Sequence, residues 1–111
     1  MTDIIEVRTT TDSIEGAHQI ADALISKRLA ACVQVSGPIT STYWWQGTIE
    51  RAQEWVCTAK TRKALYQQVE EAIRTHHTYE TPEILAVDIV DGNADYLRWV
   101  EQETNEGIRA K

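Results

Sequence analysis

The chain has 111 residues, with 17 acidic and 11 basic side chains and a formal net charge of −6. This length favours one domain over residues 1–111, which hides roughly two thirds of the surface of the unfolded chain. The Lys and Arg residues are scattered, which argues against nucleic acid as a partner. No run approaches the roughly 18 apolar residues that cross a bilayer, and no leader-like pattern opens the chain, so we expect no membrane partner and a cytoplasmic location.

The first quarter of the sequence predicts a strand followed by a helix. Residues 3–9 (DIIEVRT) are β-rich, and residues 10–31 then change to helical spacing. The apolar side chains of this second segment form one stripe, at Ala17, Ile20, Ala21 and Leu24. Asp12 followed three residues later by Glu15 is a capping-box pattern, which places the start of the helix at Asp12.

Two long β-rich runs, residues 30–45 and 48–60, flank the pair Gln46-Gly47. Because Gly supplies the positive φ of a tight turn, these runs predict a hairpin. Its strands reach ~45 Å at ~3.3 Å per residue, which is longer than a helix of about fifteen residues can cover. We therefore expect the far end of the hairpin to project. That end carries three adjacent aromatic residues, Tyr43, Trp44 and Trp45.

The second half of the sequence predicts a helix, a strand and a short helix. Residues 61–77 have an apolar stripe at helical spacing, and Thr61 is a candidate N-cap. Residues 82–90 begin with Pro, which a strand tolerates at its first residue. The last helix is expected from four apolar residues close together: Tyr96, Leu97, Trp99 and Val100. Residues 104–111 form a polar tail that we expect to fray.

This order of elements predicts an α+β, ferredoxin-like βαββαβ sandwich with a long hairpin and a short C-terminal helix. Its two helices cover one face of an antiparallel sheet, so strands facing water on the other side alternate apolar and polar residues. Residues 84–87 (ILAV) do not alternate, and one chain has no layer to bury their second face. Together with the aromatic hairpin end, they lead us to expect a closed ring of identical copies. The alternative is a hairpin that bends back on its own sheet at Gly37-Pro38.

The two cysteines are far apart in sequence and form no CxxC pair. If the hairpin turns at residues 46–47 without a bulge, Cys57 lies opposite Ser36 and ~13 Å from Cys32. A disulfide needs Cα atoms within ~7 Å. We therefore predict free thiols, unless a bulge near Pro38 shifts the pairing.

A dense polar stretch lies between the second helix and the last strand. It holds metal-binding and acid–base residue types at His76, His77, Tyr79, Glu80 and Glu83. Neighbouring helical residues do not face each other, so we expect His76 to lean toward the sheet and His77 away from it. Three interpretations stay open. The imidazoles end the helix against its dipole, they bind a transition metal such as copper, or they line a small-molecule cleft.

Signals for catalysis are weak. The sequence has no GxSxG, HExxH or P-loop pattern. Glu80 and Glu83 are separated by Pro82, so a paired-carboxylate geometry does not follow from their spacing. Lys60 is the cation we expect near them across the sheet. His18 lies on the polar face of the first helix, where we expect it to be solvated. We predict that the chain is not an enzyme.

Five separated blocks resemble the CutA family: KRLAACVQV, TSTYWWQGTIE, AKTR, HHTYETPEILAV and GNADYLRWV. The resemblance runs from Ile4 to about Val100. It implies a ferredoxin-like subunit in a tight homotrimer whose hairpins extend over neighbouring subunits. It also implies a role in the response to divalent metal ions and, in some members, copper binding.

The resemblance assigns individual residues as well. The adjacent histidines of copper-binding members match His76 and His77, but the family's thiol on the first strand is replaced by Arg8, which cannot ligate copper. The resemblance thus leaves open weaker binding, binding through another group, or none. Thr78 stands where Pro is common. Positions that line the cleft between subunits match Trp45, Lys60, Tyr79, Glu80, Pro82 and Glu83.

We therefore expect a CutA-like homotrimer that responds to divalent metal ions and has copper or another divalent cation as a possible ligand. The alternative is a trimer resembling the PII type of signalling protein, which binds an organic ligand in the inter-subunit cleft. A third, less supported hypothesis is an enzyme that uses Lys60, Tyr79 and Glu80.

Overall fold

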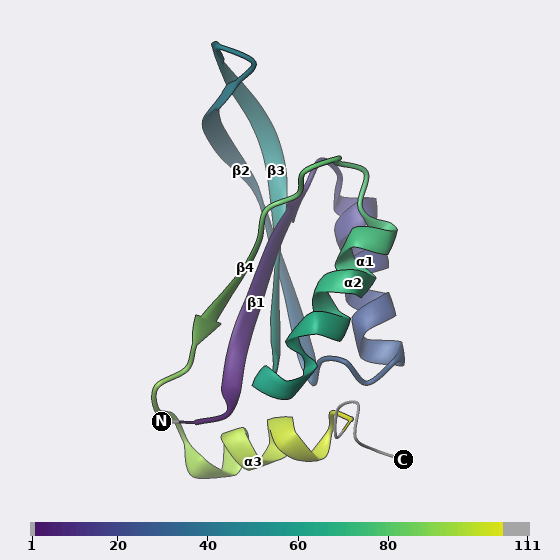
Figure 1. The fold of residues 1–111 in the computed structure, drawn as a ribbon, viewed down its shortest axis with the longest axis vertical. Helices are drawn as coiled ribbons and strands as arrows, with labels where there is room; N and C mark the ends of the chain where they lie inside the picture. Colours follow the sequence, from purple (N-terminus) through teal and green to yellow (C-terminus); the bar gives the residue numbers. More distant parts are fainter. Residues whose placement is uncertain (1, 106–111) are drawn as a thin grey trace.

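The computed structural model describes residues 2–105 of the chain. The elements follow the order β1 (Ile4–Thr11), α1 (Ile14–Ser26), β2 (Cys32–Trp45), β3 (Thr48–Arg62), a 3₁₀ turn η1 (Lys63–Leu65), α2 (Tyr66–His76), β4 (Ile84–Asp88) and α3 (Ala94–Gln102). The strands form one antiparallel sheet in the order β2-β3-β1-β4. As Figure 1 shows, α1 and α2 cover one face of the sheet, and α3 crosses the end where β1 begins.

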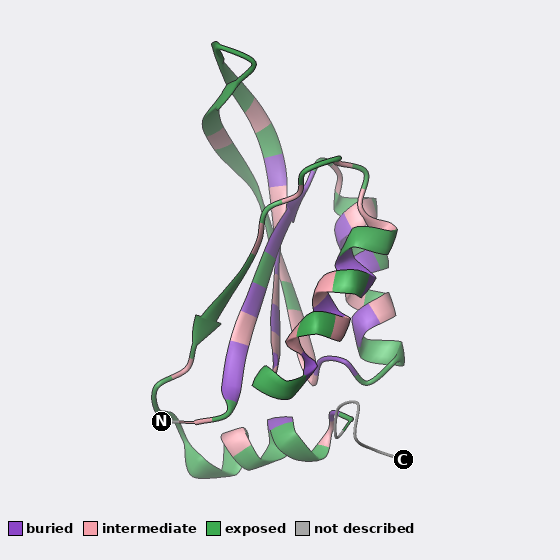
Figure 2. Ribbon diagram, in the orientation of Figure 1, coloured by how far each residue is buried: buried purple, intermediate pink, exposed green. Residues whose placement is uncertain are grey.

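The core lies between the sheet and the two covering helices. It is built from alternate residues of the central strands and from the predicted helical stripes, and Figure 2 shows this burial pattern along β1 and β3. Its members include Ile5, Val7, Ala17, Ile20, Leu24, Cys57, Ala59, Leu65, Val69 and Ile73. Residues one position along from these strand members point the other way, onto a surface that we call the open face. The open face carries Glu6, Arg8, Lys60, Leu85 and Val87.

Two predicted helix starts are wrong. The N-cap of α1 is Ser13, whose Oγ accepts a hydrogen bond from the amide of Gly16 at 3.0 Å, rather than Asp12. Thr61 belongs to β3 and is fully buried there. Its hydroxyl donates to the carbonyl of Leu29 at 2.6 Å, which satisfies the buried polar group. The chain then forms η1 before α2 begins at Tyr66 without a side-chain cap.

The hairpin turn is confirmed, because Gln46 and Gly47 have φ values of 49° and 84°. Pairing follows the predicted register from Trp45↔Thr48 down to Ile39↔Glu54. The register then shifts by one residue between Ser36 and Ile39, which places Cys57 opposite Val35. Beyond this bulge the hairpin continues away from the helices (Figure 1), so the alternative of a hairpin folded back on its own sheet is wrong.

The cysteines lie on opposite sides of the sheet. Cys32 pairs with Lys60 at the edge, whereas Cys57, three residues away from Lys60 on β3, is buried in the core. Because neighbouring side chains of a strand alternate between faces, an odd separation directs the two thiols apart. Both cysteines are free, in agreement with the prediction, and the one-residue bulge does not bring them together.

In one protomer β4 is an exposed edge strand, with Leu85 53% and Val87 49% exposed, so burial of both its faces stays a prediction about the assembly.

Thr104 does not fray, because it is buried and its hydroxyl accepts from Nε of Arg62 at 3.1 Å. The remainder of the predicted tail, residues 106–111, lies outside the described residues. Within residues 2–105, no helix is long and apolar enough to span a membrane.

Candidate functional site

The predicted cleft residues occupy separate places along the hairpin. Trp45 pairs with Thr48 at the tip of the hairpin. Tyr79 contacts Glu54 at the base of the hairpin's projecting part, and Lys60 lies near the end of β3 that is farthest from the turn. Each step of six residues along β3 is ~20 Å at ~3.3 Å per residue. One protomer therefore does not bring Trp45, Tyr79 and Lys60 into one cleft.

Lys60 lies on the open face in a polar cluster of its own. Its Nζ donates to Oε1 of Gln34 at 2.7 Å and is 3.5 Å from Oε2 of Glu6. The carboxylate beside Lys60 is thus Glu6, and Glu80 and Glu83 are both exposed on the loop before β4. The ammonium group is mostly covered and is matched in charge by its neighbour.

The two histidines have different hydrogen-bond partners. Nδ1 of His76 lies 2.9 Å from the carbonyl oxygen of Ala72, within the same helix. Because a carbonyl only accepts, Nδ1 carries the proton and Nε2 keeps its lone pair. No partner of this Nε2 is found among residues 2–105. His76 therefore offers one imidazole nitrogen that a cation can use.

His77 turns toward the sheet, contrary to the prediction that it leans away. Its Nε2 lies 2.7 Å from the carbonyl oxygen of Thr10 at the end of β1. Its Nδ1 accepts a hydrogen bond from the amide of Tyr79 at 3.1 Å. The two contacts require the neutral tautomer with the proton on Nε2, so both ring nitrogens are occupied.

Tyr79 continues these contacts to the hairpin. Its ring lies against that of His77, with centroids 4.8 Å apart, and its hydroxyl donates to Oε2 of Glu54 at 2.7 Å. The other oxygen of this buried carboxylate accepts from the hydroxyl of Ser41 at 2.7 Å. Burial, and then the hydrogen bond to Glu54, raise the pKa of Tyr79 well above its ordinary value. The phenol therefore stays protonated and acts as a donor.

Sequence reasoning missed Glu54 and Ser41. A signal for them existed, because the hairpin register that it predicted holds from the turn to Ile39↔Glu54. Ser41 is two residues from Ile39 on β2, so Glu54 and Ser41 are diagonal neighbours on one face. What the sequence did not provide was the contact with Tyr79, which is 25 residues farther along the chain.

A metal site is not complete in one protomer. Within the described part of the chain, no group of three or more His, Cys, Asp or Glu residues is placed to hold an ion. Arg8 is exposed on β1. The imidazole Nε2 of His76 and the exposed carboxylates of Asp12, Glu80 and Glu83 are donors that lie on or beside this loop. A cation bound here would need ligands beyond those that the described residues bring together.

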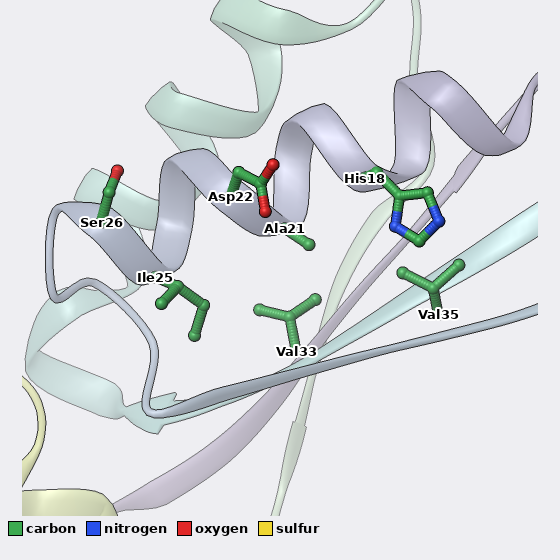
Figure 3. Close-up of a pocket in the computed structure, with 7 residues that line it drawn as sticks. All are labelled: His18, Ala21, Asp22, Ile25, Ser26, Val33 and Val35. Atoms are coloured by element: carbon green, nitrogen blue, oxygen red, sulfur yellow. The ribbon is translucent and has the colours of Figure 1, made fainter.

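A separate groove lies between α1 and the edge strand β2. It is lined by His18, Ala21, Asp22, Ile25, Ser26, Val33 and Val35, and Figure 3 shows these side chains around it. The apolar walls come from both elements, and the titratable groups are one imidazole and one carboxylate. His18, which we expected to be solvated, is exposed and borders this open groove.

The arrangement of elements defines the class of protein. Over residues 2–105 it is a mixed α+β protein with a four-stranded antiparallel sheet and three α-helices. The family model described as CutA1 divalent ion tolerance protein matches residues 5–103. The chain belongs to this family, as its sequence blocks indicated.

Relatives support this membership. The chain is 40% identical over 98 residues to the divalent-cation tolerance protein CutA of Thermus thermophilus, which covers 88% of this chain and 95% of the relative. It is 36% identical over 102 residues to the chloroplastic protein CutA 1 of Oryza sativa subsp. japonica, covering 92% of this chain but 58% of that protein's length. These names describe tolerance to divalent cations or a family, and neither describes a catalysed reaction.

Solved structures give the same result for the fold. CutA1 from Oryza sativa superposes with a TM-score of 0.92 at 35% identity, covering 96% of this chain and 97% of that one. The divalent cation tolerance protein from Thermus thermophilus superposes with a TM-score of 0.90 at 38% identity, covering 92% and 99%. The fold described above is therefore that of the family.

Proposed function

We propose that this chain forms a cytoplasmic, non-catalytic homotrimer that takes part in tolerance to divalent metal ions and captures a cation such as Cu²⁺ beside His76 and His77. The observation that carries the proposal is family membership, because relatives at 40% identity are named divalent-cation tolerance proteins. The free Nε2 of His76 gives the captured ion a first ligand, and imidazole is a ligand that copper favours.

The trimer is supported by the two free edges of the sheet. On the β2 edge, the straight segment before the bulge is Cys32–Ser36, and β4 on the opposite edge, Ile84–Asp88, has the same length. A strand edge with unpaired amides and carbonyls pairs readily with another strand. Pairing of unlike edges is head-to-tail, and it gives a closed ring when the rotation between neighbouring subunits closes. In such a ring of ferredoxin-like subunits, Leu85 and Val87 gain a covering layer.

Capture of a cation then uses groups from more than one subunit. One protomer supplies the Nε2 of His76. A projecting hairpin from a neighbour covers Glu80 and Glu83, which are exposed in a single chain. Trp45 and Lys60, which are far from Tyr79 within a protomer, reach it only from another copy. This explains why the predicted cleft residues are spread over one chain.

Calorimetric titration with Cu²⁺ tests the proposal. We expect His76→Ala to weaken binding at least tenfold, because it removes the free imidazole nitrogen, whereas His18→Ala, at a histidine on another element, leaves it unchanged. Equal affinities of the wild type and the His76→Ala variant would remove this site from the account.

The second candidate is a PII-like trimer whose inter-subunit cleft binds an organic ligand. It is favoured by one observation, namely that the described residues of a protomer contain no group of three metal-ligand side chains. Lys60 and the aromatic residues Trp45 and Tyr79 are groups suited to an anionic, planar molecule. A thermal-shift screen against anionic metabolites distinguishes the candidates, because stabilisation without added metal supports the second.

A further inference from the structure

We propose that His77 is a positioning residue rather than a metal ligand. In this proposal His77, Tyr79, Glu54 and Ser41 form a latch that holds the α2–β4 loop (residues 77–83) against the base of the hairpin. The latch goes beyond the proposed function, because it sets the direction of the hairpin whether or not a cation is bound. It also assigns different roles to the two adjacent histidines.

The first part of the latch is the imidazole of His77. The carbonyl of Thr10 needs a donor, and the amide of Tyr79 needs an acceptor, at 2.7 and 3.1 Å respectively. One neutral tautomer serves both. A cation at Nδ1 displaces the Tyr79 amide, and a cation at Nε2 displaces both the ring proton and the contact with Thr10. Coordination at Nε2 therefore costs the hydrogen bond that joins the loop to the sheet, and coordination at Nδ1 costs the one within the loop that positions Tyr79.

The second part is the carboxylate of Glu54, which is 8% exposed. Each of its oxygens accepts from one hydroxyl, Tyr79 from the loop and Ser41 from β2. Because burial penalises the charge of a carboxylate, Glu54 depends on these two donors. Removing the Tyr79 hydroxyl leaves Oε2 of Glu54 without its donor. The same change removes the hydrogen bond that joins the loop to the hairpin.

The latch also lies at a mechanically important place. Ser41 and Glu54 come just beyond the bulge between Ser36 and Ile39, where the pairing register of β2 and β3 changes. Bulges bend and twist a strand pair, so the direction of the hairpin is set here. Figures 1 and 2 show that past this point the hairpin has no helix beside it and is mostly exposed. The latch therefore lies where the helix-covered part of the hairpin gives way to its projecting part.

Amide hydrogen exchange of the full chain tests the latch. In Tyr79→Phe we expect exchange to rise roughly fivefold to tenfold, the effect of one lost hydrogen bond, both in the loop and in hairpin residues 39–54. Tyr96→Phe on α3 is the matched control and leaves both segments unchanged. A rise confined to the loop, or no rise, would overturn the latch. If Tyr79→Phe fails to fold, Glu54→Gln, which keeps the side-chain volume, is expected to give the same two-segment pattern.

A second measurement separates the roles of the histidines. In ¹⁵N NMR spectra we expect His77 to show the Nε2-protonated tautomer and to keep its shifts during a titration with Zn²⁺, while the signals of His76 move. Movement of the His77 ring nitrogens in step with Zn²⁺ would overturn the proposal. If neither ring responds, the capture of cations at this loop is contradicted, whereas the role of His77 is supported. Failure of the two proposals is therefore distinguishable.

Discussion

The two halves of β3 have the same secondary structure but different surroundings. From Cys57 to Thr61, alternate residues are buried under α1 and α2, as expected for a strand on a core. From Thr48 to Arg51, every residue is exposed. In the helix-covered half, from Cys57 to Thr61, burial and pairing both favour the strand. In the exposed half, from Thr48 to Arg51, only pairing with β2 and the turn do so. The comparison teaches that strand formation here does not require the core of the same chain.

The exposed half carries the larger apolar side chains. Trp44 and Ile49 pair on one face of the hairpin with exposures of 71% and 61%, and Tyr43 and Trp45 lie on the other at 42% and 51%. Contiguous apolar surface of this kind marks an interaction site rather than a solvated loop. The helix-covered half therefore stabilises the folded chain, and we expect the hairpin tip to make contacts with other chains.

The largest effect is expected where the core is densest. Leu24→Ala should lower the free energy of unfolding by about 2–5 kcal/mol, because it leaves a cavity beneath α1. Ile14→Ala, at a 41% exposed position on the same helix, should cost less than ~1 kcal/mol. Urea denaturation measures both. Similar losses for the two variants would contradict the placement of the core.

A comparable effect, but on assembly, is expected at the hairpin tip. Trp44→Ala should weaken self-association by about 2 kcal/mol or more, which is roughly thirtyfold, because aromatic anchors dominate interfaces. The fold of the protomer should persist, since Trp44 contributes little to its core. Sedimentation over a range of concentrations, with circular dichroism as the check on folding, gives the result. Unchanged association would mean that the tip is not an interface.

A smaller effect, a difference of about 1–2 kcal/mol between two variants, distinguishes the two ends of the hairpin. At Gly37, with φ of 141°, an added Cβ meets the carbonyl oxygen of Glu54 at 3.0 Å, whereas at Gly47, with φ of 84°, it meets nothing within 4 Å. We expect Gly37→Ala to cost about 2–3 kcal/mol and Gly47→Ala about 1 kcal/mol, which is backbone strain alone. Thermal unfolding ranks the two. The reverse order would argue that the base of the hairpin is looser than the tip.

The smallest effect concerns the pH dependence of the covered half. Burial raises the pKa of the Cys57 thiol to about 11. The unfolded chain loses this proton at lower pH than the native chain, so the free energy of unfolding should fall as pH rises through the ordinary thiol range toward 11. Cys57→Ala should reduce this fall between about pH 8 and about pH 10. Cys32→Ala is the control that keeps it, and equal slopes in both variants would exclude Cys57 as the cause.

Much of the fold could be predicted because periodicity reports burial. The stripes on α1 and α2 and the turn at Gln46-Gly47 follow from local sequence, and each is present. The caps were harder, since Asp12 and Ser13 are adjacent and both are good N-caps. Thr61 was assigned to the helix as an N-cap. The contact with Leu29 that it makes within β3 could not be predicted, because it joins residues 32 positions apart. Such contacts leave no local pattern.

The site was less predictable for the same reason. The residue types between His76 and Glu83 were identified, but their partners Thr10 and Glu54 come from β1 and β3, and Ser41, which also donates to Glu54, comes from β2. Helical geometry alone directed His77 away from the sheet, whereas α2 ends at His76 and the extended backbone at His77 turns its ring toward β1. Spacing predicts neighbours within an element and does not predict which element lies across from its end.

We expect identical chains to cover the surface which α1 and α2 leave open. Light scattering coupled to size-exclusion chromatography measures the mass of the folded particle directly. We predict three times the chain mass of 12.6 kDa. A folded particle with the mass of one chain, at micromolar concentration and physiological salt, would contradict it.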